Sequence, residues 1–220
     1  LAPEAIDPGR LLTGLDDLLR RTVGPTIELD LVIGSGLWAV RADPNQLENA
    51  LLNLILNARD AIVAGARTPG AITPGIITPG TITIEVTNAT LDHSYAERVR
   101  ELTPGAFVLF AVTDTGLGMT ADHLARATEP FFTTKPEGQG TGLGLSMVYG
   151  FAQQSGGAFH LLSKLGEGTT AEIWLPRATA AEPLPGIALL DILLVDEPTL
   201  GIDVASKAQV LALLRGLAQR

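Results

Sequence analysis

Residues 42–62 read ADPNQLENALLNLILNARDAI, and this stretch decides the fold because it encodes one long amphipathic helix. Asp43, which a proline follows, is typical of an N-cap before a first helical proline. Apolar residues then recur at helical spacing, at Leu47, Leu51, Leu54, Ile55, Ala58 and Ile62. Asn53, Asn57 and Asp60 share a polar stripe of the same helix. A solvated face would explain such a stripe, but asparagine carbonyl oxygens are also suitable ligands for magnesium.

Further helices and strands are predicted on both sides of this helix. Leucines between Leu11 and Leu19 predict an opening helix, and residues 27–33 alternate as a strand does. Clusters of β-branched and aromatic residues predict four more strands, at 81–86, 107–113, 158–163 and 170–175. A last helix follows Leu143 and ends at the pair Gly156 and Gly157. Repeated Pro-Gly is incompatible with a helix or a central strand and predicts a surface loop, with Thr-Pro-Gly triplets at Thr68, Thr73 and Thr78.

The composition limits the kinds of ligand and partner. With 220 residues, 46% apolar and 18% charged, the chain can bury one sizeable core and carry a small second unit. A net charge of -9 and only three lysines argue against a nucleic-acid surface, so an anionic ligand must be held locally. The lack of cysteine excludes disulfides, zinc-thiolate sites and thiol nucleophiles. No uncharged apolar run approaches the roughly 18 residues of a membrane span.

The motif DTGLGM, from Asp114 to Met119, directly follows a predicted strand. A carboxylate at the end of a strand can accept a hydrogen bond from an exocyclic amine. The two glycines that follow allow the main chain to approach a flat ring, and Met119 offers an apolar wall beside it. A structural turn would also explain this motif when it is taken alone.

A second glycine-rich motif, GQGTGLGLS at residues 138–146, stands immediately before a helix. Free N–H groups and the positive end of the helix would face one point there, as a phosphate site requires. No lysine follows a glycine, so the motif is not a Walker loop. Between the two glycine motifs, Phe131 and Phe132 predict a hinged lid, and Lys135 supplies a positive charge for terminal phosphates.

The order of these motifs resembles the N, G1, F and G2 boxes of the ATP-binding domain of sensor histidine kinases, a member of the GHKL superfamily. The resemblance runs from about Leu11 to Arg177 and also includes the segment GEGTTAEIWLPR. It implies an α+β fold of the Bergerat type, a two-layer α/β sandwich in which helices cover one face of a mixed sheet. The same architecture occurs in gyrase-type and chaperone ATPases.

The resemblance also implies a role for each matching residue, with ATP and Mg²⁺ as cofactors. Asn57 would ligate magnesium, Asn53 would assist at the phosphates, and Asp60 would be a further ATP-binding residue. Asp114 would hold the adenine amine, and Thr169 would support the adenine through its hydroxyl group or a water. The residues expected around the base and in the lid are Gly116, Gly118, Met119, Phe131, Phe132 and Lys135. Those expected to close over the phosphates are Gly140, Thr141, Gly142, Leu143, Gly144 and Leu145.

One position separates a kinase from an ATPase within this family. Relatives that hydrolyse ATP carry a glutamate general base one helical turn before the magnesium asparagine, where this chain has Asn53. Transfer to a protein nucleophile is therefore favoured, with Asn53, Asn57 and Lys135 as the catalytic set. A nucleotide-binding regulatory module, or an ATPase without kinase activity, is the alternative.

None of the three histidines is placed like a phosphoacceptor. The acceptor would have to lie on a separate histidine-bearing dimerisation domain, without which this chain would be inactive. A response regulator and a homodimer in the full-length protein follow from the same resemblance. So does a cytoplasmic location, either free or as the cytoplasmic part of a membrane-anchored sensor.

The predicted organisation has four parts. Residues 1–25 end a dimerisation helix or linker, 26–177 form the catalytic domain, and 178–189 form a linker. Residues 190–220 predict a strand and a helix that resemble the Walker B and D-loop stretch of ABC-transporter ATPases, with Asp196, Glu197 and Asp203. Without a P-loop this tail would have no catalysis of its own, and a remnant of a response-regulator receiver is the alternative.

Overall fold

The computed structural model describes residues 3–66, 80–91, 102–136 and 140–178. These residues all belong to the first of the two units into which the chain divides, Leu1–Pro183. The predicted tail and most of the predicted Thr-Pro-Gly loop lie outside the described residues.

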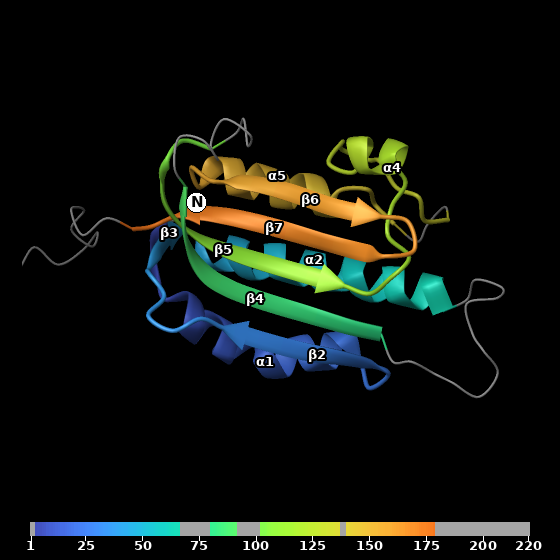
Figure 1. Ribbon diagram of the computed structural model, residues 1–220, viewed down its shortest axis with the longest axis horizontal. Coiled ribbons are helices and arrows are strands. Elements are labelled where there is room, and N and C mark those ends of the chain that lie inside the picture. The colour runs from blue at the N-terminus through green and yellow to red at the C-terminus, as the bar shows by residue number, and fades with distance from the viewer. Residues whose placement is uncertain (1–2, 67–79, 92–101, 137–139, 179–220) are drawn as a thin grey trace, which may run out of the picture. The chain divides into compact units, whose positions relative to one another are not determined.

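The centre of this unit is a five-stranded mixed sheet with the strand order β2-β4-β5-β7-β6 (Figure 1). Strand β2 runs parallel to β4, and the other three pairings are antiparallel. The strands span Ile27–Ile33 (β2), Gly80–Leu91 (β4), Gly105–Asp114 (β5), Ala158–Lys164 (β6) and Gly168–Pro176 (β7). The register places Asp114, the last residue of β5, opposite Thr169 at the start of β7.

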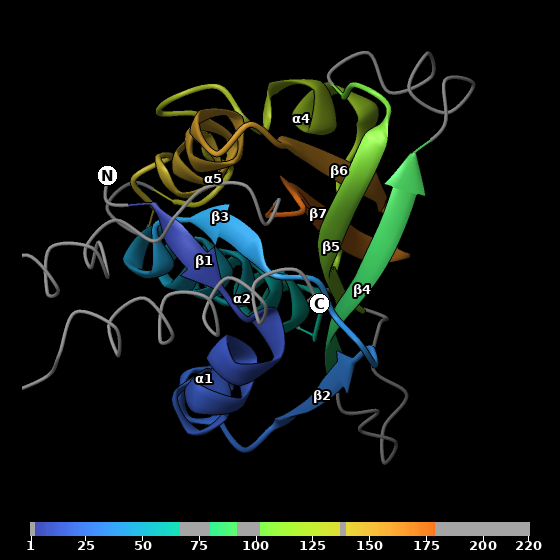
Figure 2. The same ribbon diagram turned by 90° about the vertical axis from the view of Figure 1, so that its left-hand side faces the viewer.

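Three helices cover one face of the sheet, as the edge-on view in Figure 2 shows. They are α1 (Pro8–Val23), α2 (Pro44–Ala66) and α5 (Gly144–Gln154). A short helix, α4 (Ala121–Arg126), follows the turn after β5. Two short strands, β1 (Glu4–Ile6) and β3 (Val40–Ala42), pair in a separate small sheet. The predicted fold class, a mixed sheet with helices on one face, is confirmed.

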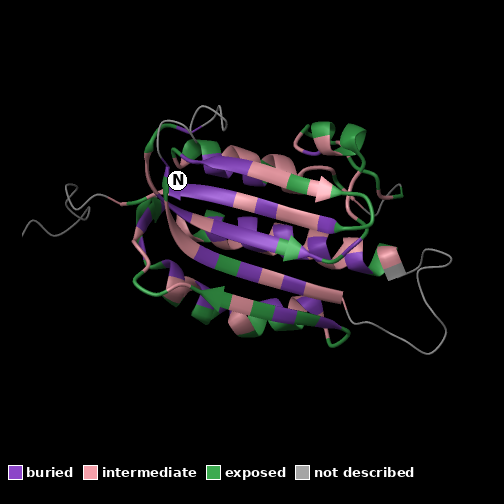
Figure 3. Cartoon of the chain, viewed as in Figure 1, coloured by how far each residue is buried: buried purple, intermediate pink, exposed green. Residues whose placement is uncertain are grey.

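The core lies between the helices and the sheet. Alternate residues of β5 point into it, so Val108, Phe110 and Val112 are buried against the helices. Thr113 on the same strand is exposed on the opposite face, and Figure 3 shows this alternation of buried and exposed residues along the strands. A smaller cluster on that face includes Phe107 and Trp174, whose rings meet edge to face at 6.5 Å.

Helix α2 begins where its sequence predicts. The backbone N–H of Gln46 donates to Asp43 Oδ1 at 3.2 Å, which is the expected cap. The predicted apolar stripe of α2 is entirely buried, through Leu47, Leu51, Leu54, Ile55, Ala58 and Ile62. Burial of this stripe fixes the rotation of α2 about its axis and leaves the polar stripe at the side of the core.

The observed elements are longer than most predicted ones. Helix α1 begins at Pro8 because Asp7 caps it, accepting from the backbone N–H of Arg10 at 3.1 Å. Helix α1 buries Leu12, Leu15 and Leu19 in the same core as the sheet. Strands β1 and β3 were not predicted, since three-residue strands carry no measurable alternation. In the part of the chain that the structure describes, no helix is long and apolar enough to cross a membrane.

The position of the core can be tested by truncating one buried phenylalanine and one exposed leucine to alanine. Phe110 is completely buried, whereas Leu162 on β6 is 59% exposed. Phe110→Ala should lower the free energy of unfolding by about 3–5 kcal/mol, because it leaves a cavity in the core. Leu162→Ala should change it by less than about 0.5 kcal/mol. Urea unfolding followed by circular dichroism measures both, and equal losses would contradict the assignment of the two sheet faces.

Candidate functional site

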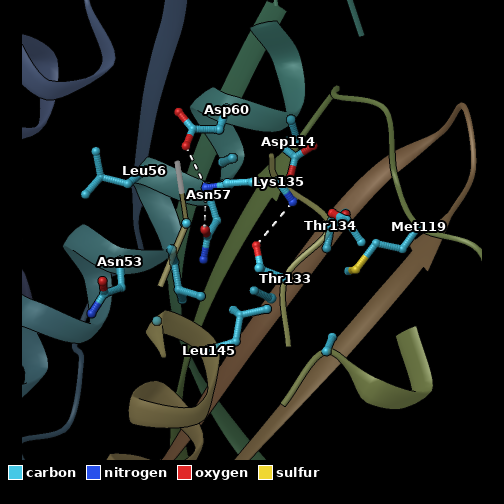
Figure 4. Close-up of a pocket in the computed structure, with 18 of the residues that line it drawn as sticks. Asn53, Leu56, Asn57, Asp60, Asp114, Met119, Thr133, Thr134, Lys135 and Leu145 are labelled. Atoms are coloured by element: carbon cyan, nitrogen blue, oxygen red, sulfur yellow. Dashed lines mark hydrogen bonds and ion pairs between the residues drawn. The ribbon is translucent and has the colours of Figure 1, made fainter. Parts of the chain in front are cut away.

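A cavity of about 660 Å³ lies between α2, the start of α5, the sheet and the loop after α4. Most of the predicted site residues converge on it from sequence positions far apart. Those that line it are Asn53, Asn57, Asp60, Asp114, Gly118, Met119, Phe132, Lys135, Gly140, Thr141, Gly142, Gly144, Leu145 and Thr169. The close-up in Figure 4 shows Asn57, Asp60 and Lys135 side by side, with Asp114 and Met119 further along the cavity wall.

One end of the cavity is formed by Asp114, a buried residue that is only 6% exposed. Its Oδ1 accepts from the backbone N–H of Gly116 at 2.8 Å, and the backbone of Thr169 also donates to the carboxylate. Burial raises the pKa of Asp114, although both hydrogen bonds act in the opposite direction. The carboxylate therefore retains an acceptor for a ligand in a poorly hydrated place.

The turn after Asp114 is held by main-chain contacts that leave no room for side chains. The N–H of Leu117 donates to the carbonyl of Ala61 on α2 at 3.2 Å. Gly118 has a φ of 66°, and a Cβ there would collide with the carbonyl of Lys164. Glycine is required at this position on both counts, which explains the second glycine of the motif.

Ser163 on β6 supports this end of the cavity from outside its lining, and sequence reasoning missed it. The N–H of Met119 donates to Ser163 Oγ at 2.9 Å, and Ser163 Oγ donates to the carbonyl of Gly168 at 3.0 Å. Its Oγ also lies 2.8 Å from Thr169 Oγ1. Ser163 thus links the DTGLGM turn to the start of β7. A serine in a strand gives no local signal of such a role, because its partners lie in other segments.

The other end of the cavity is formed by the start of α5. A Cβ at Gly144 would lie 3.6 Å from Asn53 Oδ1 and from Asn57 Nδ2, so both amides face this helix terminus. Among the described residues no side chain caps α5, whose N-cap is Leu143. The first N–H groups of the helix and its positive dipole end therefore lie close to the asparagines.

A charged cluster lies beside the two asparagines. Lys135 Nζ donates to Asp60 Oδ2 at 2.7 Å and lies 3.5 Å from Asn57 Oδ1. Arg59 Nη2 donates to Asp60 Oδ1 at 3.0 Å. Burial by itself would raise the pKa of Asp60, but the hydrogen bonds and charges of Lys135 and Arg59 together hold it below its usual value. Asp60 is therefore ionised. Arg59 is a second residue of the cavity, after Ser163 at its border, that sequence reasoning missed.

The predicted lid is joined to the second glycine motif by its backbone. The N–H of Phe131 donates to the carbonyl of Gly142 at 2.9 Å. Both residues have a positive φ, 68° for Phe131 and 67° for Gly142, which is uncommon for phenylalanine. The Phe132 ring instead lines the cavity, and the guanidinium of Arg126 lies 4.3 Å from its centre.

Three predicted site residues do not line the cavity. Gly116 lies behind Asp114 and acts on it through its N–H group. The Phe131 side chain is 74% exposed, and Leu143 serves as the N-cap of α5. The ligand roles predicted for all these residues stay predictions, because geometry alone does not test them.

The two ends of the cavity suit two different chemical groups. The buried carboxylate of Asp114 accepts hydrogen bonds and is flanked by apolar surface, which fits a flat ring with an exocyclic amine. The uncapped start of α5 lies beside Asn57, which Lys135 Nζ approaches at 3.5 Å, and this arrangement fits an anion. A single ligand that reaches both ends would carry an amine-bearing ring at one end and negative charge at the other.

Comparison with known proteins agrees with this class of site. The sequence pattern of the family described as "Histidine kinase-, DNA gyrase B-, and HSP90-like ATPase" matches residues 42–179, which is more than half of the chain. The chain therefore belongs to this family, and its predicted resemblance to the ATP-binding domain of histidine kinases is confirmed.

Among its relatives, the sensor kinase CckA of Brucella abortus is 44% identical over 177 residues, which make up 80% of this chain and 17% of CckA. The sensor histidine kinase ZraS of Escherichia coli (strain K12) is 33% identical over 177 residues, which make up 80% of this chain and 31% of ZraS. The chain thus spans less than a third of the length of these relatives.

Two solved structures share the fold. Full-length ShkA in complex with AMPPNP has a TM-score of 0.59 and 28% identity, with 84% of this chain and 33% of ShkA covered. The mycobacterial sensor histidine kinase MprB has a TM-score of 0.55 and 24% identity, with 80% of this chain and 97% of that one covered. The family match identifies a histidine kinase- and HSP90-like ATPase type of domain, whereas magnesium stays a prediction.

The burial of Asp114 has a consequence for stability that can be measured without any ligand. Because burial raises its pKa, folding favours the protonated carboxyl. This contribution to stability is complete below the unfolded value of 3.8 and is lost as the pH rises through the higher folded pKa. Asp114→Asn cannot ionise, so its free energy of unfolding should fall less steeply over this pH range. Urea midpoints measured at stepped pH give both profiles, and parallel profiles would contradict the stated effect of burial.

Proposed function

We propose that this chain binds ATP with magnesium in the cavity and donates the γ-phosphoryl group to a histidine on a separate dimerisation domain of a sensor histidine kinase. One observation carries the proposal: a buried acceptor and an uncapped helix start form opposite parts of one cavity. The named relatives support the kinase class, because CckA and ZraS are sensor kinases.

The base end would recognise adenine through its amine. Asp114 accepts the exocyclic N–H, and Thr169 adds a hydroxyl group on the same wall of the cavity. Met119, whose N–H is held by Ser163, provides an apolar contact for the ring. These contacts position the nucleotide so that its triphosphate extends toward α5.

The phosphate end would hold the triphosphate and its metal ion. The N–H groups at the start of α5 bind phosphate oxygens, and Asn53 and Asn57 border the same space. Among the described residues no group of three or more His, Asp or Glu could bind a metal ion. Asn57 therefore fits magnesium only as one oxygen ligand beside phosphate and water oxygens. Bound magnesium would supply charge neutralisation at the phosphates.

Asn53 favours phosphoryl transfer over hydrolysis. It stands beside the start of α5, where a general base would have to activate water. An asparagine amide cannot accept a proton at neutral pH, so water at this point stays a weak nucleophile. The site then contributes positioning and electrostatic stabilisation, which is what transfer to a histidine needs.

The wider assignment follows from the same proposal. Residues 26–177 would be the catalytic domain, and 178–189 would be a linker. Residues 1–25 would end the dimerisation helix or linker that leads from the histidine-bearing domain, and their helix α1 packs into the core of the catalytic domain. The histidine domain would form a homodimer and pass the phosphoryl group on to a response regulator. The kinase would act in the cytoplasm.

Nucleotide binding is tested by thermal unfolding with ATP, with and without magnesium. ATP should raise the unfolding temperature of the unmodified chain, because a ligand stabilises the state that binds it. Asp114→Asn should abolish this rise, since the amide presents an N–H to the adenine amine. Asn57→Ala should keep the rise but lose most of its dependence on magnesium. An unaltered rise in Asp114→Asn would contradict the adenine assignment.

Two adjacent threonines provide a matched pair for the same measurement. The side chains of Thr169 and Thr170 point to opposite faces of β7, and only Thr169 lines the cavity. Thr169→Val should reduce the ATP-dependent rise, whereas Thr170→Val should keep it. Equal effects would show that the loss arises from the strand and not from the cavity.

Phosphoryl transfer is tested by mixing this chain and labelled ATP with the histidine-bearing domain of a relative such as CckA. Acid-labile label should appear on the added domain, and this chain alone should remain unlabelled. A variant of the added domain without its histidine is the control. Label on this chain itself, or ATP hydrolysis without transfer, would contradict the proposal and favour an ATPase or a regulatory module.

A further inference from the structure

The carboxylate of Asp60 is divided between two cations. Its Oδ2 accepts from Lys135 Nζ at 2.7 Å, and its Oδ1 accepts from Arg59 Nε at 3.2 Å and Arg59 Nη2 at 3.0 Å. All three side chains are about one third exposed, with values of 33% for Lys135, 34% for Asp60 and 36% for Arg59. Each cation therefore has its own oxygen, and either one can leave without displacing the other.

Lys135 cannot keep its short ion pair with Asp60 and contact the phosphates of a bound nucleotide at the same time. Its ammonium lies 3.5 Å from Asn57 Oδ1, and that asparagine borders the start of α5. In the structure its shortest contact is with Asp60, so its charge is largely neutralised. Moving toward an anion at α5 would break this ion pair and leave a partly buried carboxylate, which is costly unless another cation remains.

We propose that Arg59 is a positioning residue that keeps Asp60 neutralised, so that Lys135 can exchange Asp60 for the terminal phosphate of bound ATP. This inference rests on the proposed function, since it needs a nucleoside triphosphate in the cavity. Its new content is an exchange of partners within a triad of Arg59, Asp60 and Lys135.

The anchoring of Arg59 supports this role. Its Nη1 donates to the carbonyl of Thr22 at 3.1 Å, in the last turn of α1, while Nε and Nη2 face Asp60. The guanidinium is thus fixed at both sides by groups that do not include Lys135. A lysine could not make this arrangement, because it lacks the planar fork of donors. The lowered pKa of Asp60 agrees, since the carboxylate is ionised and needs a permanent counter-charge.

A purely structural role for Arg59, as a link between α1 and α2, makes a different prediction. Loss of that link would weaken the binding of every nucleotide alike, because it would loosen the cavity wall. The partner exchange affects only the phosphate that Lys135 reaches. The ratio of the dissociation constants for ADP and ATP therefore separates the two roles.

The experiment measures the Kd of ATP and of ADP, each with magnesium, by calorimetry on the full 220-residue chain. Arg59→Gln should lower the ratio of the ADP Kd to the ATP Kd by roughly fivefold, because Lys135 is then retained by Asp60. In Asp60→Asn, Lys135 has no carboxylate to leave, so adding Arg59→Gln should lower the ratio no further. The double variant thus tests the coupling within the triad directly.

Arg20→Gln is the matched control. Arg20 also ties α1 to its surroundings, through a hydrogen bond from Nη1 to the carbonyl of Leu29 at 3.0 Å, but it does not line the cavity. This variant should leave the ADP-to-ATP ratio unchanged even if its unfolding temperature falls, and a matching fall in the ratio would overturn the proposal.

Four further outcomes are decisive. An equal loss of ATP and ADP affinity in Arg59→Gln, or a ratio that falls just as far in the Asp60→Asn background, would overturn the partner exchange. Normal ATP binding with an unchanged ratio in Arg59→Gln would overturn it while the proposed function stands. Failure of the unmodified chain to bind ATP would overturn the proposed function and, with it, this inference.

Discussion

The site depends on how α2 packs against the sheet. Burial of Leu51 and Ile55, both fully enclosed, fixes the rotation of this helix. Once that face is fixed, Asn53, Asn57 and Asp60 must all border the cavity. Each buried leucine or isoleucine contributes about 1.5–3 kcal/mol, so the polar stripe is held by contacts that no ligand has to provide. Core packing and ligand geometry are thus two consequences of one amphipathic pattern.

The base end of the cavity contains a buried carboxylate, although a carboxylate is more stable in water. Among the described residues, Asp114 is the only polar or charged residue that is buried. Hydrogen bonds from two main-chain donors offset the free-energy cost of this burial only in part. A ligand amine would supply the missing partner. Without ligand, the incompletely paired carboxylate destabilises the fold. This is expected of a binding site and not of a structural core.

Sequence reasoning found what is encoded locally. The Asp43 cap, the helix after it and the main strands follow from short-range periodicity, and the two glycine motifs are contiguous. Ser163 and Arg59 were missed because their partners, Met119 and Thr22, lie 44 and 37 residues away in sequence. Lys135 lines the cavity, where its role stays a prediction, and its ion pair with Asp60 depends on tertiary packing that no local pattern encodes.

The net negative charge of the chain means that the phosphate end must attract an anion through short-range contacts. A chain with a net charge of -9 repels a nucleoside triphosphate at long range, so attraction must come from groups within a few ångströms. In the proposed site, the uncapped start of α5 and Lys135 would provide it, while Asn53 adds no further negative charge where a carboxylate would. In the proposed kinase, the same substitution that spares the phosphates a repulsive neighbour also leaves water without a base. Tight local binding and slow hydrolysis then have a common cause, which preserves the phosphoryl group until a histidine is presented.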